Sequence, residues 1–351
     1  MGTLISILSA ILIFSFLIFI HELGHFVCAK LSGVQVNEFS MFMGPVIWKK
    51  QKGETLYSLR CIPIGGFCAM EGEDTDTENP RSFQKAKWWK RLIILVAGAA
   101  MNFVAGVALL GICYAPAQAF IVPVISQVEE NCSLAEGDGI RAGDRLLAID
   151  NERIYVSSDF DTLISLSGSQ THDILVERDG QKVLLEDVLT ERRGFQDGIR
   201  FGFSFSVEEA TFSGKLNYVW NTTLDTVRLV RLSLKMLVTG QAGLSDMSGP
   251  VGIVQMMSET AESAPTRLDA LLNMIYFGGF IAINLAVMNL LPIPALDGGR
   301  VVGVLVTAAV EAVIGKKINP KYEGYLHGVG MLLLLALMAI IMFKDIFFLF
   351  K

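Results

Sequence analysis

The sequence predicts a polytopic α-helical membrane protein with four transmembrane helices, a membrane-associated β-hairpin on the cytoplasmic side and one extracytoplasmic α+β domain. The nine apolar residue types make up 52% of the 351 residues, and charged residues make up only 18%. Soluble domains usually carry about 25% charged residues. Four stretches contain the ~20 apolar residues that a membrane-spanning helix needs. A long polar segment between the second and third stretches is large enough to fold as a soluble domain.

The overall charge and the cysteines exclude several other classes of protein. The net charge of −6 argues against nucleic acid as the main partner, because nucleic acid favours a basic surface. No two of the five cysteines are spaced as CxxC, so the sequence indicates neither a disulfide framework nor a cysteine-based zinc site. The five are Cys28, Cys61, Cys68, Cys113 and Cys132.

The first two predicted elements are a transmembrane helix over residues 1–29 and a cytoplasmic-side hairpin loop over residues 30–91. Residues 1–20 carry no charged side chain, and neither a basic leader nor a small-residue cleavage site marks them as a signal peptide. We therefore interpret them as part of a retained span. In the loop, Val36–Val46 and Glu54–Ile62 have strand character and are predicted to pair as a hairpin.

A second transmembrane helix is predicted over residues 92–120, and the soluble α+β domain over residues 121–205. Two turn signals, Asp150-Asn151 and Asp179-Gly180, separate strand-like runs, and Ser158 is placed to cap a short helix. The four strand-like runs are Ile121–Val128, Arg145–Ile149, His172–Arg178 and Gln181–Leu189.

The rest of the chain is predicted to contain a linker (206–269), a third transmembrane helix (270–291), a turn with a cytoplasmic loop (292–324) and a fourth transmembrane helix (325–345). Within the linker, Lys215–Val238 has helical periodicity. This periodicity fits either an amphipathic helix on the membrane surface or a helix packed on the soluble domain. The run Val301–Val310 is too short to span a membrane.

The distribution of Lys and Arg predicts the orientation. The loop over residues 30–91 contains ten of them, and the loop between the third and fourth helices contains four. Because short loops rich in Lys and Arg remain in the cytoplasm, both loops are predicted to be cytoplasmic. The two termini and the 121–205 domain are then predicted to be extracytoplasmic.

The strongest chemical signal is His21-Glu22-Leu23-Gly24-His25, at the end of the first apolar stretch. Residues four apart lie on one face of a helix, so His21 and His25 can bind one ion. Zinc accepts imidazole nitrogen, and Glu22 is placed to take a proton from a water molecule on the metal. HExxH also occurs by chance in unrelated chains, but ionisable residues inside an apolar span are usually functional. The motif therefore predicts a zinc site with Glu22 as the catalytic base.

A catalytic zinc needs a third protein ligand, for which Asp297 is the candidate. This residue follows the third span, at the end that the predicted topology places on the same side as the two histidines. An Asp before Gly is by itself a common turn pair. Here, however, two prolines unwind the chain just before it and two glycines just after it permit a sharp reversal. The four are Pro292, Pro294, Gly298 and Gly299.

Two asparagines lie in predicted apolar helices. The amide of Asn289 either binds the backbone of a substrate or caps the carbonyls that the broken helix leaves free, and the sequence leaves both roles open. Asn102 lies between Gly98 and Gly106 at four-residue spacing, which favours close helix packing. The two remaining histidines have no metal-ligand neighbours in the sequence and are interpreted as ordinary polar residues; they are His172 and His327.

Together these motifs resemble those of the bacterial site-two protease family, the intramembrane zinc metalloproteases of the RseP type. HELGH matches the HExxH of the family, and residues 289–298 match its NxxPxxxLDG. Residues 98–103 resemble its GPxxNF, with Ala99 in place of proline, and residues 38–45 resemble its EFSIGFGP, with Phe42 in place of glycine. Residues 121–205 resemble its PDZ module, and residues 248–252 resemble its SGPxGI element.

The resemblance implies a multi-pass enzyme of the bacterial cytoplasmic (inner) membrane that uses Zn2+ to hydrolyse a peptide bond in or near the transmembrane segment of a membrane-anchored protein. The implied substrates are single-pass proteins, such as anti-sigma factors already cut outside the membrane, or remnant signal peptides. The PDZ-like domain would bind a peptide or exclude bulky substrates, and the hairpin edges could hold an unwound substrate by strand addition. The alternative is a catalytically silent membrane scaffold that binds partners through the PDZ-like domain, against which the intact Glu22 argues.

Overall fold

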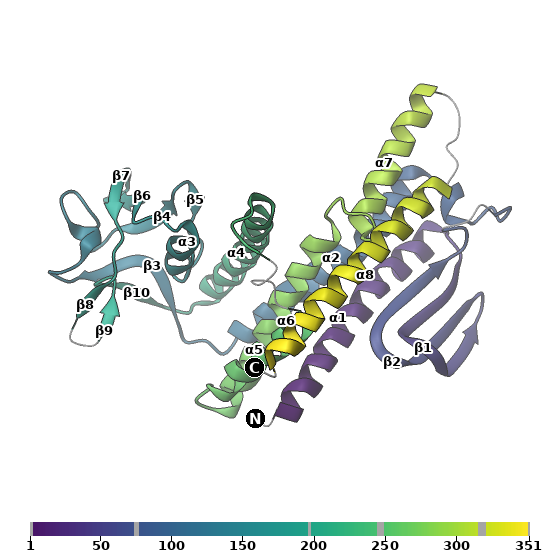
Figure 1. The fold of residues 1–351 in the computed structure, drawn as a ribbon, viewed down its shortest axis with the longest axis horizontal. Helices are drawn as coiled ribbons and strands as arrows, with labels where there is room; N and C mark the ends of the chain where they lie inside the picture. The colour runs from purple at the N-terminus through teal and green to yellow at the C-terminus, as the bar shows by residue number, and fades with distance from the viewer. Residues whose placement is uncertain (1–2, 74–76, 196–197, 244–248, 315–320, 350–351) are drawn as a thin grey trace. The chain divides into compact units, whose positions relative to one another are not determined.

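The computed structural model describes residues 3–73, 77–195, 198–243, 249–314 and 321–349 (Figure 1). The chain forms two compact units. The first combines residues 1–113 with residues 230–351, and the second consists of residues 114–229. We call the first the membrane unit and the second the sheet unit.

The membrane unit is built from helices. Among the described residues, four helices are long and apolar enough to cross a membrane: α1 (Thr3–Ser32), α2 (Trp88–Tyr114), α6 (Arg267–Asn289) and α8 (Lys321–Leu349). Two shorter helices, α5 (Pro250–Glu262) and α7 (Asp297–Ile314), flank α6 in the sequence. The second span was predicted to reach residue 120, but α2 ends at Tyr114. Pro116 explains this end, because proline cannot continue a helix and disfavours helical geometry in the residue before it.

The loop between α1 and α2 folds into two long, bent strands, β1 (Val36–Lys52) and β2 (Thr55–Met70). The hairpin expected here is present, but it curls so that β1 and β2 pair twice. Residues 46–52 pair with the first half of β2, and that half pairs in turn with residues 38–41. Residues 36–41 also pair, on their other side, with residues 66–70.

The curl makes the segment Gly66–Met70 an outer edge of the hairpin sheet. The chain bends near Phe42, whose φ is +70°, and near Gly65, whose φ is +75°. Positive φ is strained for phenylalanine, so the surrounding pairing must hold this bend in place. Within the described residues, the far side of Gly66–Met70 has no strand partner.

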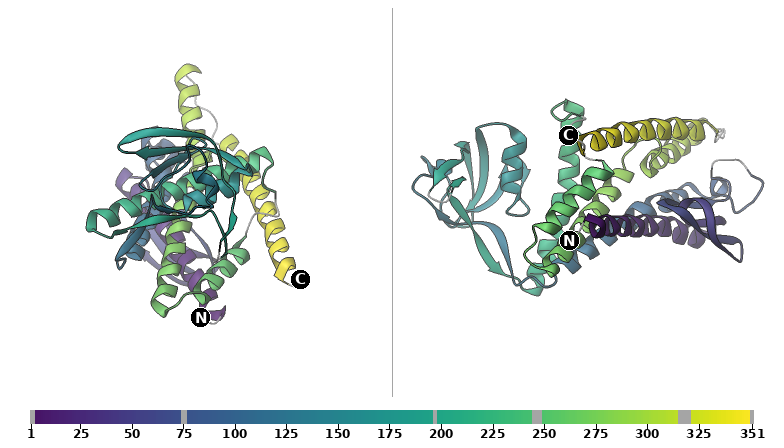
Figure 2. Two further views of the ribbon diagram at one scale, coloured as in Figure 1. Left: turned by 90° about the vertical axis from the view of Figure 1, so that its left-hand side faces the viewer. Right: turned by 60° about the horizontal axis from the view of Figure 1, so that its bottom comes forward.

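The hairpin packs on α1 and α2 through one apolar core, and Figure 2 shows it beside α1. The ring of Phe39 in β1 lies between Phe19 and Phe26 of α1, at centroid distances of 6.0 Å and 5.0 Å. The hairpin is therefore fixed to the helix that carries the HELGH motif. The buried members of this core are Ala29, Val34, Val36, Phe39, Cys68, Met70, Phe83, Ile94, Leu95 and Val304.

Helices α2 and α6 approach closely at Gly106. A Cβ atom on Gly106 would lie 2.6 Å from Cγ1 of Ile283 and 3.0 Å from the carbonyl oxygen of Gly279. Any larger residue would therefore push the two helices apart. The close packing predicted for the small residues of the second span is present at this crossing.

A buried carboxylate in α8 holds the start of α5. Oδ2 of Asp345 accepts hydrogen bonds from the backbone N–H groups of Gly249, at 2.9 Å, and Gly252, at 3.1 Å. These groups belong to the first turn of a helix, where no helical carbonyl can accept them. Asp345 therefore caps α5, and it ties this helix to the last span.

The sheet unit contains an antiparallel sheet with the strand order β10-β3-β4-β6-β7, off which β5 pairs with β4; β8 and β9 form a separate pair. The domain boundary predicted at residue 205 is wrong, because β10 pairs with β3 as far as Glu209. The bounds are β3 (Ala119–Val128), β4 (Arg145–Ile149), β5 (Glu152–Arg153), β6 (Thr171–Arg178), β7 (Gln181–Leu189), β8 (Arg193–Phe195), β9 (Gly198–Arg200) and β10 (Phe203–Glu209).

The short helix of the sheet unit, α3 (Asp159–Ser167), is not capped as predicted. Ser158 has helical backbone angles, and its side chain makes no capping hydrogen bond. Instead, Oδ2 of Asp159 accepts hydrogen bonds from the backbone N–H groups of Tyr155, at 2.6 Å, and Val156, at 3.1 Å. A carboxylate has more acceptor capacity than a hydroxyl, and here it fixes the turn that precedes the helix.

The long helix α4 (Phe212–Thr239) packs on the sheet unit at least as far as Arg228. The guanidinium of Arg228 lies 3.0 Å from Oδ1 of Asp159 and also pairs with Asp225. Nearer the start of α4, the ring of Tyr218 stacks on Phe120 of β3 at a centroid distance of 4.1 Å. This part of α4 therefore follows the second of the two interpretations drawn from the sequence, a helix packed on the soluble domain.

Asp345→Ala is expected to destabilise the membrane unit. The substitution leaves two backbone N–H groups without their charged acceptor, which lowers the free energy of unfolding by about 2–4 kcal/mol. The measurement is thermal unfolding of the full chain in detergent. Asp345→Asn keeps one acceptor oxygen and should lose less than half as much. An Asp345→Ala protein that unfolds at the wild-type temperature would contradict the capping role.

Candidate metal centre

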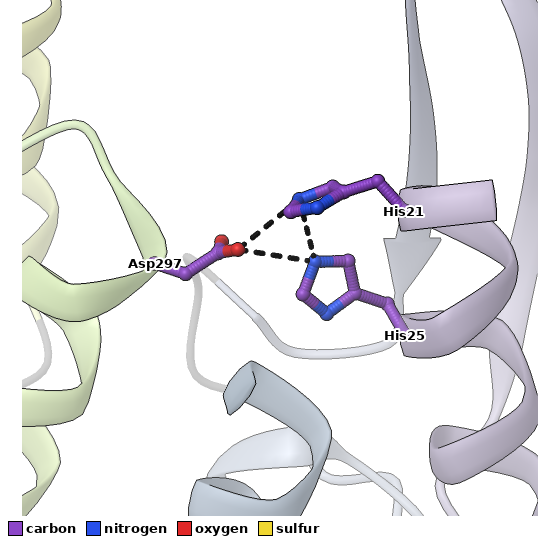
Figure 3. Close-up of side chains that lie close together, drawn as sticks. All are labelled: His21, His25 and Asp297. Carbon is purple, nitrogen blue, oxygen red and sulfur yellow. Dashed lines mark hydrogen bonds and ion pairs between the residues drawn. The ribbon is translucent and has the colours of Figure 1, made fainter. Parts of the chain in front are cut away.

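Helix α1 places His21 and His25 one turn apart on the same face (Figure 3). Their Nε2 atoms lie 3.2 Å from each other. The side chains are only 13% and 9% exposed. Two imidazole nitrogens thus meet in a mostly buried position inside a helix that is apolar enough to cross a membrane.

Asp297, the first residue of α7, completes a triangle with the two histidines (Figure 3). Its Oδ2 atom lies 3.1 Å from Nε2 of His21 and 3.3 Å from Nε2 of His25. Four ligands at 2.0–2.1 Å around zinc hold neighbouring donor atoms roughly 3.3 Å apart in a tetrahedron. The three donor atoms therefore have the spacing of three corners of a tetrahedral site, and the fourth corner is left for water or substrate.

The far nitrogens of both imidazoles meet groups of α2. Nδ1 of His25 donates a hydrogen bond to the carbonyl oxygen of Ile94 at 2.8 Å, so the neutral imidazole carries its proton on Nδ1 and presents Nε2 as the nitrogen that can bind a metal. Nδ1 of His21 lies 3.4 Å from Nδ2 of Asn102. Oδ1 of Asn102 is buried and has no hydrogen-bond partner among the residues that the structure describes. Exchanging the two amide atoms of Asn102 would let Oδ1 accept a hydrogen bond from the Nδ1–H group of His21, so both histidines could present Nε2.

This contact corrects the role assigned to Asn102 from the sequence. The flanking glycines do serve close packing, but Asn102 itself is 1% exposed and lies against a histidine of the site. Its position inside an apolar span was the available signal, because buried polar side chains in such helices usually have a specific partner.

Two glycines make the room that the site needs. A Cβ atom on Gly24, inside the HELGH motif, would overlap the carbonyl group of Ala97 in α2. A Cβ atom on Gly98 would overlap Nε2 of His25 and lie 2.7 Å from Cε1 of His21. Gly24 therefore lets α1 touch α2, and Gly98 leaves open the space in which the imidazoles lie.

The turn between α6 and α7 aims Asp297 at the histidines, but not in the way predicted. The reversal occurs before Asp297, at Ala295, whose φ is +86°. Gly298 and Gly299 instead lie in the first turn of α7. A Cβ atom on either would overlap a backbone carbonyl oxygen: Leu290 or Leu291 for Gly298, and Ile293 for Gly299.

His327 of α8 supports this turn. The backbone N–H of Ala295 donates a hydrogen bond to Nδ1 of His327 at 3.1 Å. Close by in α8, a Cβ atom on Gly330 would lie 2.7 Å from the carbonyl oxygen of Pro294. His327 is therefore more than the ordinary polar residue predicted from the sequence, because it holds Ala295, the strained residue two positions before the candidate ligand Asp297.

His172 lies in the sheet unit, where its Nδ1 pairs with Oδ2 of Asp150 at 2.6 Å.

Glu22 lies between the two histidines in sequence and faces the hairpin edge. A Cβ atom on Gly66 of β2 would lie 3.4 Å from Cγ of Glu22. The carboxylate also hydrogen-bonds with the backbone of Cys68. Glu22 is not one of the three residues that form the candidate metal cluster. The one acidic residue of HELGH is thus next to both the donor triangle and the free edge of Gly66–Met70.

Asn289 is the last residue of α6 and is half-buried. In the part of the chain that the structure describes, its side chain makes no hydrogen bond. The carbonyls at this helix end are instead used by the turn itself, since Leu290 and Leu291 donate to Val287 and Met288. Of the two roles left open by the sequence, capping of freed carbonyls is therefore not observed.

The model of one protein family, described as peptidase family M50, matches residues 9–337. The chain belongs to peptidase family M50. A relative from Clostridium perfringens, named as a candidate zinc metalloprotease, is 36% identical over 346 residues, which cover 97% of this chain and 98% of the relative. The regulator of sigma-W protease RasP from Bacillus subtilis is 28% identical over 427 aligned residues, with 97% of this chain and 98% of that protein covered.

Gly98→Ala is expected to remove the metal from the protein. The added methyl group would overlap Nε2 of His25 and displace this imidazole, so metal affinity should fall at least tenfold, as expected when the support of a metal ligand is disturbed. Metal content of the purified full chain is the measurement. Gly111→Ala is the matched control, because a Cβ atom at this α2 position meets nothing within 4 Å. Equal metal content in both variants would contradict the packing argument.

Proposed function

We propose that the protein hydrolyses a peptide bond in or near the transmembrane segment of membrane-anchored proteins, with zinc held by His21, His25 and Asp297. The observation that carries this proposal is the triangle of two imidazole nitrogens and one carboxylate oxygen inside the membrane unit. Family membership identifies the chain as a metallopeptidase of the site-two type, and zinc is its metal. The donor set fits zinc, which accepts imidazole nitrogen and carboxylate oxygen in tetrahedral sites.

Glu22 is proposed as the catalytic base. When bound, zinc polarises a peptide carbonyl and makes a water molecule acidic enough to ionise near neutral pH. Glu22 is next to the ligand His21 in sequence, so its carboxylate can take the proton of that water and later give it to the leaving amine. The imidazoles are oriented toward the candidate metal position because their Nδ1 atoms face Ile94 and Asn102.

The hairpin edge is proposed to hold the substrate. A helical substrate hides its carbonyls in hydrogen bonds, so it must unwind before hydrolysis. Within the described residues the segment Gly66–Met70 has no strand partner on its side next to Glu22, so an extended peptide can add there as a further strand. Such a peptide would replace the hydrogen bonds that Cys68 and Met70 now make with Glu22 and Glu73. The free amide of Asn289 is a further candidate contact for the substrate backbone.

The substrate class is inferred from the relatives and the membrane unit. One relative is named a regulator of sigma-W protease, which supports membrane-anchored regulators such as anti-sigma factors as substrates. Remnant signal peptides have the same chemistry, a short apolar helix with a polar end. The silent-scaffold alternative is not supported, because the relatives are named as proteases and Glu22 is intact.

The sheet unit is proposed to be the extracytoplasmic, PDZ-like module. Its strand β10 is the last strand of the sheet, and one edge of β10 has no strand partner within the described residues. The ring of Phe203 in β10 lies 5.0 Å from that of Phe160 in α3. A free strand edge beside an aromatic helix surface suits an extended peptide ligand.

Glu22→Gln and Asp297→Ala are expected to fail in different ways. Glu22→Gln should keep its zinc and lose peptidase activity by about 10²–10⁴-fold, because it removes proton transfer alone. Asp297→Ala should lose zinc as well as activity. Zinc content and cleavage of a membrane-anchored test substrate, with and without chelator, are measured on the same preparations. Full zinc occupancy in Asp297→Ala would remove this residue from the ligand set.

The proposed sidedness predicts the labelling of cysteines. Cys61 in the hairpin is exposed, whereas Cys132 in the sheet unit is buried and cannot serve as a reporter. Gln181→Cys supplies an exposed reporter in the sheet unit. A membrane-impermeant thiol reagent added to intact cells should label Gln181→Cys, and should label Cys61 only after the cells are opened. Labelling of Cys61 but not of Gln181→Cys on intact cells would show the opposite orientation and contradict the proposal.

A further inference from the structure

A polar cavity of about 280 Å³ lies where α1 ends and α2 begins. Its walls come from the last residues of α1, from the segment just before α2 and from the first turn of α2. This volume is near the lower end of ligand pockets, roughly 300 Å³, so it suits a small polar group. The lining includes Ser32, Arg81, Ser82, Lys85, Lys87 and Lys90, and none of the lining residues is acidic.

The charges around this cavity are unbalanced. Arg81 is paired with Glu54, whose two carboxylate oxygens each lie 2.7 Å from a guanidinium nitrogen. Lys90 donates a hydrogen bond to the carbonyl oxygen of Ser32 at 2.8 Å. This hydrogen bond caps the end of α1. Lys85 and Lys87 are exposed and form no ion pair within the part of the chain that the structure describes. The cavity therefore has a strong excess of positive charge.

A neutral feature adds to the attraction for an anion. The first turn of α2 lies at the positive end of the dipole of a 27-residue helix, although the N–H groups of Lys90 and Arg91 already donate to the carbonyl oxygen of Lys87. Lys87 precedes this turn and Lys90 lies within it.

The surroundings place the cavity at the boundary of the membrane. It lies between the end of one candidate span and the start of the next. Trp88 and Trp89, the first residues of α2, are 52% and 44% exposed. Tryptophan is enriched at the headgroup level of membranes, where its ring is half apolar and half wet.

We propose that this cavity binds the phosphate headgroup of an anionic phospholipid. Lys85 and Lys87 would contact the phosphate, while Trp88 and Trp89 lie among the acyl chains next to it. Basic pockets between transmembrane helices on the cytoplasmic side suit such headgroups. The proposal uses the orientation given above but is independent of the metal centre, because none of the lining residues is a metal ligand.

The test is calorimetric titration of the full, zinc-loaded chain in an uncharged detergent. The probe is dihexanoyl phosphatidylglycerol, with dihexanoyl phosphatidylcholine and inorganic phosphate as comparison ligands. Wild-type protein should bind the phosphatidylglycerol, bind it more weakly at high salt, and bind the other two at least tenfold more weakly. Lys85→Gln/Lys87→Gln should bind it about thirtyfold more weakly, since each lysine near anionic lipid contributes about fivefold.

Lys49→Gln/Lys50→Gln is the matched control. It removes the same charge from exposed positions of β1 and should change the affinity less than about twofold, since these lysines lie outside the cavity. Equal binding of inorganic phosphate would make the cavity a soluble-anion site and overturn the assignment. Equal losses in the two double variants, or no binding by wild type, would also overturn it. Zinc content and peptidase activity, measured in parallel, separate this outcome from failure of the proposed function.

Discussion

The close approach of α1 and α2 is the constraint on which the rest of the membrane unit depends. Gly24 touches the carbonyl group of Ala97, and Gly98 leaves the space that the imidazoles of His21 and His25 occupy. In an apolar environment each imidazole also needs a partner for the nitrogen that does not face the metal. Residues 94, 98 and 102 lie on one face of α2 at four-residue spacing, so a single face supplies both the space and the partners.

The third proposed ligand comes from a turn, and neighbouring residues hold the conformation of that turn. Ala295 has a positive φ, a strained conformation for a residue with a side chain. The hydrogen bond to His327 and the close packing of Gly330 on Pro294 hold this conformation. Asp297 then begins α7, where the helix dipole favours a negative charge. The local structure therefore stabilises the ionised form of Asp297 that a metal ligand must have.

Much of this arrangement follows from the sequence, because it rests on patterns with short periods. Apolar stretches predicted the four long helices, strand-like runs and turn pairs predicted four strands of the sheet unit (β3, β4, β6 and β7), and the HExxH spacing predicted that His21 and His25 share a face. Contacts across helices could not be read in this way. Asn102 lies next to His21, and His327 supports Ala295, because of the way the helices pack on one another. No local sequence pattern shows which helices face each other.

The turn chemistry was predicted only in part for a related reason. Pro292 and Pro294 correctly indicated that the helix ends before Asp297. The reversal was assigned to Gly298 and Gly299 because glycine tolerates positive φ. In the structure, however, these glycines are needed because backbone carbonyl oxygens lie where a Cβ atom would be. A glycine in a sequence does not show which of the two properties is needed. The curl of the hairpin was missed similarly, because its bend includes Phe42 at a positive φ.

The position of the hairpin gives the proposed chemistry a thermodynamic basis. A peptide inside an apolar layer cannot exchange its helical hydrogen bonds for bonds to water, so unwinding it leaves costly unpaired groups. The edge Gly66–Met70 can supply those bonds once a peptide displaces the contacts of Cys68 with Glu22 and of Met70 with Glu73, and the same segment lies next to Glu22. The residues that would replace the lost bonds are therefore beside the residue that would move the proton. Because Phe39, Phe19 and Phe26 fix the hairpin to α1, an extended substrate on this edge would be aligned with the helix that carries His21 and His25.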